Sequence, residues 1–287
     1  MKTTIRTLWN SFLIIFLGTL LAGQVHGQIF VTNSNGVIGK YDYTSGATLN
    51  ASFISGLSYP WGIVLSGENL FVTNNTAQTI GKYNADTGAT VNPSLVSGLN
   101  GPDGIALAGG KIFVANSGYG SGTTVGKYIA TTGATVNASF ISGLSSPAGV
   151  AVSGGHLYVV NVNSGTIGKY NATTGATVNA SLVSGLSNPS GIAVSGGNLF
   201  VTNQTSGTIG EYDAATGATV NASLVSGLSN PLGIAVNGVY IFVTNSSSGT
   251  IGVYNAETGA TVNASFISGL SFPIGIAVQC DCKVEPE

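Results

Sequence analysis

Short apolar runs alternate with small polar segments through most of this chain. In one stretch, residues 191–194 (Gly-Ile-Ala-Val) and 199–203 (Leu-Phe-Val-Thr-Asn) flank a Ser-Gly-Gly-Asn turn. Residues 208–213 and the polar segment 218–228 follow at similar spacing. β-Branched and aromatic residues favour strands, and Gly and Asn tolerate the positive φ that tight turns need. The pattern predicts four short strands, and the many Gly and β-branched residues disfavour helix.

This four-strand pattern recurs with a period of about 42 residues. The six copies start at Ile29, Leu70, Ile112, Leu157, Leu199 and Ile241. A period of about 40 to 50 residues with four strands per unit is typical of propeller blades. We therefore predict an all-β fold over residues 28–279, a six-bladed β-propeller with four-stranded blades. A parallel β-helix is the alternative, although its coils are usually shorter.

The phase of the repeat predicts how the ring closes. The first copy begins with a second strand at residues 29–33, and the chain ends with a first strand at residues 275–278. We expect this C-terminal strand to join the N-terminal blade, which would hide two sheet edges. Deletion of residues 274–278 should then open the ring.

The N-terminus has the pattern of a secretory leader. Lys2 and Arg6 precede an apolar segment at residues 12–22, and Val25-His26-Gly27 provides small residues for cleavage before Gln28. Residues 1–27 are therefore predicted to be a signal peptide, which would make the protein secreted, extracellular or periplasmic. An uncleaved membrane anchor is the alternative, although the segment is short for a bilayer span.

The tail, residues 280–287, contains the two cysteines of the chain, Cys280 and Cys282. A disulfide across one intervening residue is strained and easily reduced. The pair is interpreted as a local staple or as free thiols. A redox or intermolecular role is the alternative.

Charge is scarce, and this narrows the possible partners. Charged residues make up 6% of the chain and the net charge is −2, against about 25% charged residues in a typical domain. No run of Lys or Arg offers a footprint for nucleic acid or a polybasic patch for anionic lipid. We expect no nucleic-acid partner and no membrane insertion after signal cleavage.

Several segments resemble a known repeat family. They are Leu-Phe-Val-Thr-Asn at 70–74 and 199–203, Ile-Phe-Val-Thr-Asn at 29–33, and Pro-x-Gly-Ile-Ala-Val at 189–194 and 231–236. These segments resemble the YVTN family of β-propeller repeats and are similar to NHL repeats. The resemblance covers almost the whole mature chain and implies a six-bladed ring. Because these families include surface proteins, interaction modules and some enzymes, it implies little about activity.

Residues repeated in every copy are interpreted as structural. An Asn ends each second strand, where its side chain could form an Asx-turn with the following loop. A Tyr in each third strand is expected to pack between blades. These residues are Asn33, Asn74, Asn116, Asn161, Asn203 and Asn245, and Tyr41, Tyr83, Tyr128, Tyr170, Tyr212 and Tyr254. The repeated glycosylation sequons, as at Asn50, are interpreted as a by-product of the repeat. His156 is the one histidine after the leader, so no Ser-His-Asp triad, catalytic residue or metal site is predicted.

Positions where the copies differ are the candidates for binding. The residue between Pro and Gly in each first strand, and the residue just before that Pro, should lie at the mouth of the central channel. Tyr119, in the one extended loop, should lie on the same face. The apolar and aromatic residues of this set come from neighbouring blades and would form an arc facing the polar ones. The candidate ligand-binding residues are Tyr59, Trp61, Asp103, Tyr119, Ser190, Leu232, Phe272 and Ile274. Aromatic residues facing polar ones would suit an amphipathic ligand such as a sugar or a peptide. The alternative is that Trp61 and its neighbours only plug the channel or cover the closure seam.

Together these features predict an exported, non-enzymatic propeller without a cofactor. It would bind an unidentified protein, peptide or glycan, or serve as a structural module at the cell surface. The alternative is a gluconolactonase-like or lyase-type propeller enzyme with a divalent metal in the channel. Asp103 is the one carboxylate at the predicted mouth, which is a poor ligand set for a hard cation.

Overall fold

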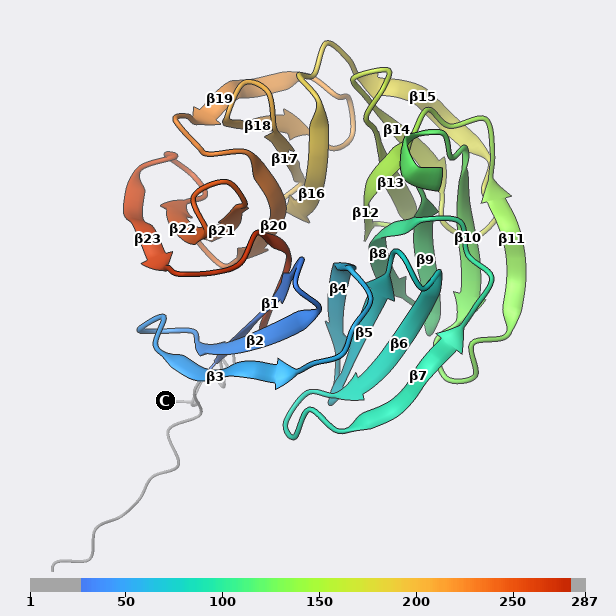
Figure 1. The fold of residues 1–287 in the computed structure, drawn as a ribbon. Helices are drawn as coiled ribbons and strands as arrows, with labels where there is room; N and C mark the ends of the chain where they lie inside the picture. The colour runs from blue at the N-terminus through green and yellow to red at the C-terminus, as the bar shows by residue number, and fades with distance from the viewer. Residues whose placement is uncertain (1–26, 280–287) are drawn as a thin grey trace, which may run out of the picture.

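The computed structural model describes residues 27–279, which form six four-stranded antiparallel sheets arranged in a ring (Figure 1). This arrangement confirms the predicted six-bladed β-propeller. The predicted signal peptide, apart from Gly27, and the tail with Cys280 and Cys282 lie outside the described residues.

The two inner strands of each blade are its most apolar. The first strands, which face the central axis, are β4 (Pro60–Ser66), β8 (Pro102–Ala108), β12 (Pro147–Ser153), β16 (Pro189–Ser195), β20 (Pro231–Asn237) and β24 (Pro273–Gln279). The second strands are β1 (Gln28–Asn33), β5 (Asn69–Asn74), β9 (Lys111–Asn116), β13 (His156–Asn161), β17 (Asn198–Asn203) and β21 (Tyr240–Asn245). Each first strand begins at the repeat's proline, about two residues earlier than the pattern of hydrophobic residues predicted.

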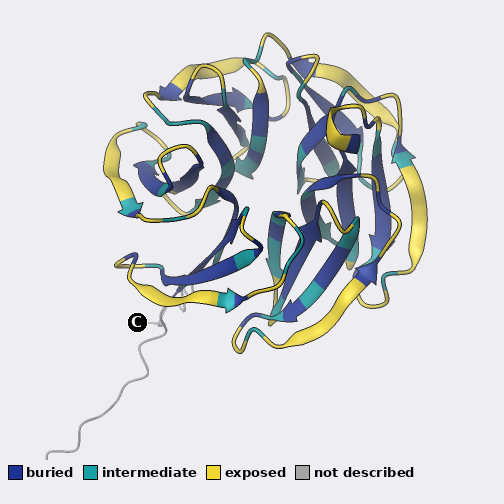
Figure 2. Ribbon diagram, viewed as in Figure 1, coloured by how far each residue is buried: buried dark blue, intermediate teal, exposed yellow. Residues whose placement is uncertain are grey.

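In the outer half of each blade the third strand is largely buried and the fourth strand is exposed. The third strands are β2 (Val37–Asp42), β6 (Thr79–Asn84), β10 (Thr124–Ile129), β14 (Thr166–Asn171), β18 (Thr208–Asp213) and β22 (Thr250–Asn255). The fourth strands are β3 (Thr48–Ile54), β7 (Thr90–Val96), β11 (Thr135–Ile141), β15 (Thr177–Val183), β19 (Thr219–Val225) and β23 (Thr261–Ile267). Figure 2 shows the exposed fourth strands forming the rim of the ring around a buried interior. One short 3₁₀ helix, η1 (Gly118–Gly120), lies between β9 and β10.

The ring closes through the first blade, as the phase of the repeat predicts. Strand β24 pairs antiparallel with β1, with Phe30 opposite Ala277 and Val31 opposite Ile276. The blade therefore has the strand order β24-β1-β2-β3, combining the two ends of the described chain. This pairing covers edges that would otherwise expose unpaired backbone groups.

The hydrophobic core lies between blades rather than within them. Six clusters of buried side chains each join two neighbouring blades, and one of them packs Phe30 and Ile38 against Leu70 and Tyr83. The third-strand tyrosines are buried in these clusters, which confirms their predicted packing role. A Cβ added to Gly81 would lie 2.6 Å from the ring of Tyr83. In the Gly-x-Tyr pattern of the third strand, the missing side chain of the glycine therefore leaves room for the tyrosine ring to pack on its own strand.

Two of the asparagines that end second strands, Asn161 and Asn203, bond differently from the prediction. Asn203 accepts a hydrogen bond from the backbone amide of Ser187 at 3.3 Å, and its own amide donates to Thr208 at 3.4 Å. Ser187 precedes the blade's first strand, so this side chain bridges two connections instead of forming an Asx-turn. Asx-turns occur instead after third strands, where the Asp213 carboxylate accepts from the Ala215 amide, two residues on, at 3.1 Å.

A candidate binding pocket at the mouth of the channel

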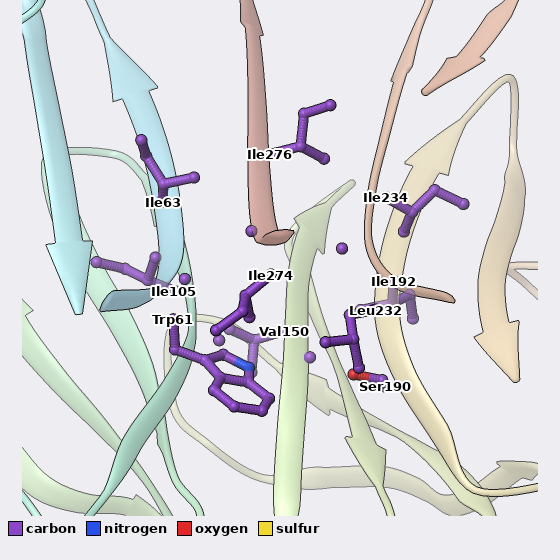
Figure 3. A pocket seen from close by; sticks show the side chains of 16 residues that line it. Trp61, Ile63, Ile105, Val150, Ser190, Ile192, Leu232, Ile234, Ile274 and Ile276 are labelled. Atoms are coloured by element: carbon purple, nitrogen blue, oxygen red, sulfur yellow. The ribbon is translucent and has the colours of Figure 1, made fainter. Parts of the chain in front are cut away.

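The first strands line a narrow central channel of about 90 Å³. In their shared pattern Pro-x-Gly-Ile, with Val150 replacing Ile in β12, the x residues form one ring of side chains and the Ile or Val residues form a second. Figure 3 shows Trp61, Ser190 and Leu232 at one end of the channel, and Ile63 and Ile276 at the other. The intervening glycine is required by close approach of the blades, since a Cβ at Gly62 would lie 2.5 Å from the Asp103 carbonyl oxygen.

The residue before each first-strand proline has an unusual backbone conformation. Its φ lies between 49° and 53° at all six positions, Tyr59, Gly101, Ser146, Asn188, Asn230 and Phe272. Positive φ is rare for bulky residues, and a following proline adds a further restriction. A repeated hydrogen bond stabilises it, because each carbonyl accepts from the loop amide after the second strand, as Tyr59 accepts from Asn75 at 3.1 Å. This conformation leaves the Tyr59 and Phe272 side chains partly exposed at the start of the first strands.

A second cavity of about 340 Å³ lies at the mouth of the channel. Five of the eight predicted binding residues line it, namely Tyr59, Trp61, Asp103, Tyr119 and Ser190. Ser146 and Asn188, from the residues before proline, form part of its polar wall. Trp61 and Ser190 line both this mouth pocket and the channel beneath it. The indole of Trp61 therefore lies between the channel and the mouth pocket and is available to a ligand in the mouth pocket.

The other three predicted residues lie elsewhere. Leu232 and Ile274 line the channel and are 3% and 1% exposed. Phe272 is 40% exposed and lines neither the mouth pocket nor the channel. The apolar arc predicted around the mouth is therefore split, with Tyr59 and Trp61 in the pocket and the aliphatic residues in the channel.

Asp103 carries the electrostatic character of the mouth pocket. It is 8% exposed, and its Oδ1 accepts a 2.7 Å hydrogen bond from the Asn75 side-chain amide of the neighbouring blade. The Ser117 hydroxyl lies beside the carboxyl and donates its proton to the Gly101 carbonyl at 2.8 Å. Burial raises the pKa of Asp103 to about 7, against the opposing effect of the bonds with Ser117 and Asn75. A carboxyl in a cleft that titrates near neutrality is a candidate functional group.

Tyr119 covers the seam beside Asp103. It lies in η1 with φ 56° and is 61% exposed. Its hydroxyl donates a 3.2 Å hydrogen bond to the Asn75 carbonyl. On its other side, Asn163 donates to the Gly120 carbonyl at 3.0 Å. The extended third-repeat loop is therefore tied to both neighbouring blades, which fixes Tyr119 on the same face as Trp61.

Among the lining residues outside the predicted set, four come from a part of the repeat that was not considered for binding: Asn75, Ser117, Val162 and Gln204. All four occupy the same place in the repeat, directly after the asparagine that ends the second strand. This position differs from copy to copy, so the criterion that selected Trp61 and Asp103 would also have selected it. This position lies at the mouth because its backbone amide donates to the carbonyl of the residue before the first-strand proline. The pattern of hydrophobic residues does not reveal that hydrogen bond.

Within residues 27–279, no three His, Cys, Asp or Glu side chains come together as ligands for a metal ion. No helix in this range has the length and hydrophobicity to cross a membrane.

Comparison with known proteins identifies the fold. No family model matches the sequence, and no curated protein matches it. A chain in the crystal structure of the nidogen/laminin complex is similar in fold, with a TM-score of 0.73 and 14% identity, covering 88% of this chain and 98% of that one. The computationally designed Ika8 protein is also similar, with a TM-score of 0.51 and 16% identity, covering 86% and 74% of the two chains. At these identities the likeness shows the propeller fold alone, and the resemblance to YVTN and NHL repeats stays a prediction.

Proposed function

We propose that this protein is an exported β-propeller that binds a partner at the mouth of its channel. It acts as an interaction module outside the cytoplasm or at the cell surface. The observation that carries this proposal is that side chains differing between repeats converge on one pocket, with aromatic Tyr59, Trp61 and Tyr119 near polar Asp103 and Asn188. Concave sites with aromatic walls and a few fixed polar groups are typical of ligand pockets.

The nidogen/laminin complex supports the proposal independently of the pocket. A propeller of similar fold occurs there in a complex of proteins. The leader pattern at residues 1–27 supports export, since this arrangement of positive, apolar and small residues is that of a secretory signal.

A binding screen with one matched pair of variants tests the proposal. Residues 28–287 would be screened against immobilised glycans and peptides, together with Trp61→Ala and Tyr240→Ala. Tyr240 is the first residue of β21, is 38% exposed and lines a different pocket. We expect saturable binding that weakens at least about tenfold in Trp61→Ala and is unchanged in Tyr240→Ala. The proposal fails when wild type shows no saturable binding or when both variants bind equally.

Export is tested separately. Secretion of the full chain, followed by mass spectrometry, should give a mature N-terminus at Gln28. Retention of an intact leader in a membrane fraction would instead favour an uncleaved anchor.

The enzyme alternative has one feature in its favour, the Asp103 carboxyl whose burial raises its pKa to about 7. Metal analysis of the purified protein distinguishes the two functions. Stoichiometric Ca²⁺ or Zn²⁺ that leaves on Asp103→Ala substitution would favour a metal-dependent propeller enzyme over a binding module.

A further inference from the structure

The carboxyl of Asp103 is buried without a positively charged neighbour in the mouth pocket. Its Oδ1 is held by the neutral Asn75 amide at 2.7 Å, and Ser117 is its other side-chain partner. The residues that line the pocket include no Lys, Arg or His, and the titratable groups beside Asp103 are the phenols of Tyr59 and Tyr119. Buried carboxylates in proteins are generally paired with a cation, so this carboxylate lacks its usual counter-charge.

Three aromatic side chains gather at the same seam between blades. The rings of Tyr59 and Trp61 are 5.8 Å apart, tilted by 43°. Tyr119 is fixed by its hydroxyl to the carbonyl of Asn75, the residue whose side chain holds Asp103. The faces of Trp and Tyr rings attract cations, and this attraction strengthens where water is excluded.

We propose that this seam is a receptor for an alkylammonium group, of the kind a lysine side chain of a protein or peptide partner carries. Asp103 supplies the counter-charge, and Tyr59, Trp61 and Tyr119 supply the aromatic walls. This inference rests on the proposed function and names the chemistry of its ligand. A neutral sugar would use the aromatic walls but would leave the carboxylate unpaired.

Binding of such a cation is coupled to the proton on Asp103. The ammonium group pairs with the ionised carboxylate, so it competes with protonation of that group. Because burial raises the pKa of Asp103 to about 7, roughly one-tenth of the carboxyl is ionised at pH 6 and about nine-tenths at pH 8. The affinity for the cation should therefore rise about tenfold between these pH values.

Tryptophan fluorescence gives a direct measurement. The chain has two tryptophans, Trp9 in the leader and Trp61 in the mouth pocket, so a protein beginning at residue 28 reports on Trp61 alone. It would be titrated with an acetylated, amidated pentapeptide carrying one central lysine. The same peptide with norleucine replaces the ammonium by a methyl group and is the matched control ligand. We expect saturable binding of the lysine peptide, about tenfold tighter at pH 8 than at pH 6, and no saturable binding of the norleucine peptide.

Asp103→Asn is the decisive variant, because it keeps an acceptor for the Asn75 amide while removing the charge. It should weaken lysine-peptide binding at pH 8 by about tenfold or more and abolish the pH dependence. Should this variant fail to fold, Tyr119→Ala, which alters an exposed side chain, should weaken the same binding.

Two results would overturn the inference. They are equal binding of the lysine and norleucine peptides, or wild-type affinity in Asp103→Asn at pH 8. If a glycan binds in a manner sensitive to Trp61→Ala while the lysine peptide does not, the proposed function stands and the cation assignment is wrong. If no ligand of any class binds, both are wrong.

Discussion

The hydroxyl of Thr202 donates a 2.7 Å hydrogen bond to the carbonyl of Leu232 in the next blade. The same hydroxyl accepts a 2.8 Å bond from the amide of Gly191 in its own blade. One buried side chain therefore links the first strands of two blades. The equivalent residues Thr32, Thr73 and Thr244 make the same two bonds at other seams, and Ala115 and Val160 replace them at the remaining two.

Thr202→Val should lower the free energy of unfolding by about 1–2 kcal/mol. The substitution keeps the shape of the side chain but leaves a buried amide and carbonyl without their partner. Urea denaturation measures the change. Thr219→Val, at an exposed position of β19, is the control and should leave the midpoint unchanged. An unchanged midpoint for Thr202→Val would show that the link contributes nothing.

Val160→Thr should raise the free energy of unfolding by about 0.5–1 kcal/mol. The new hydroxyl would donate to the Ser190 carbonyl, which is equivalent to the carbonyls that accept from threonine at the other seams. The neighbouring Val159 is also fully buried, but it faces the apolar cluster with Leu157 and Tyr170. Val159→Thr should therefore be destabilising, since its hydroxyl would lack a partner. Stabilisation of both variants, or of neither, in thermal and urea unfolding would contradict this difference.

Removal of β24 should abolish cooperative unfolding. A chain ending at Phe272 loses the first strand of the blade that holds β1, and with it the pairing of Phe30 with Ala277. The exposed edge and the opened core between blades would favour aggregation. A chain ending at Gln279 keeps every described strand and is the control. Circular dichroism and calorimetry would show a single sharp transition for the control and none for the shorter chain; a sharp transition in both would disprove the role of closure.

Asp103 should make stability depend on pH. Its pKa rises from 3.8 to about 7 in the folded protein because of burial. The folded chain therefore keeps a proton that the unfolded chain releases between these values. The resulting stabilisation is complete below about pH 4 and is lost as the pH rises through about 7.

Relative to Asp103→Asn, wild type should lose on the order of 4 kcal/mol of stability between pH 4 and pH 8. Urea unfolding of both proteins at the two pH values gives the difference directly. A stability difference that stays constant with pH would contradict the shift.

Much of the mouth pocket could be predicted because variation stands out against a regular repeat. Trp61 and Asp103 occupy the same repeat position as Ala148, and a blade geometry repeated six times places them at the same level of the ring. Asn75 and Gln204 were not predicted because hydrogen bonds between loops place them at the mouth. Their backbone amides donate to the carbonyls of Tyr59 and Asn188, which have positive φ. Phe272 precedes a first-strand proline, as Tyr59 does, but it lines neither the pocket nor the channel.

The sequence by itself determined the blades, their number and the closure of the ring. Strand alternation, glycine turns and a fixed period are local properties, and a repeat can bury its apolar faces only against its neighbours. Only the tertiary structure decided which polar groups meet across a seam. The bond between Asn75 and Asp103 joins residues from different blades, and burial in the folded protein raises the pKa of this carboxyl. Desolvation depends on the surroundings in space, so it becomes visible only once the ring has been assembled.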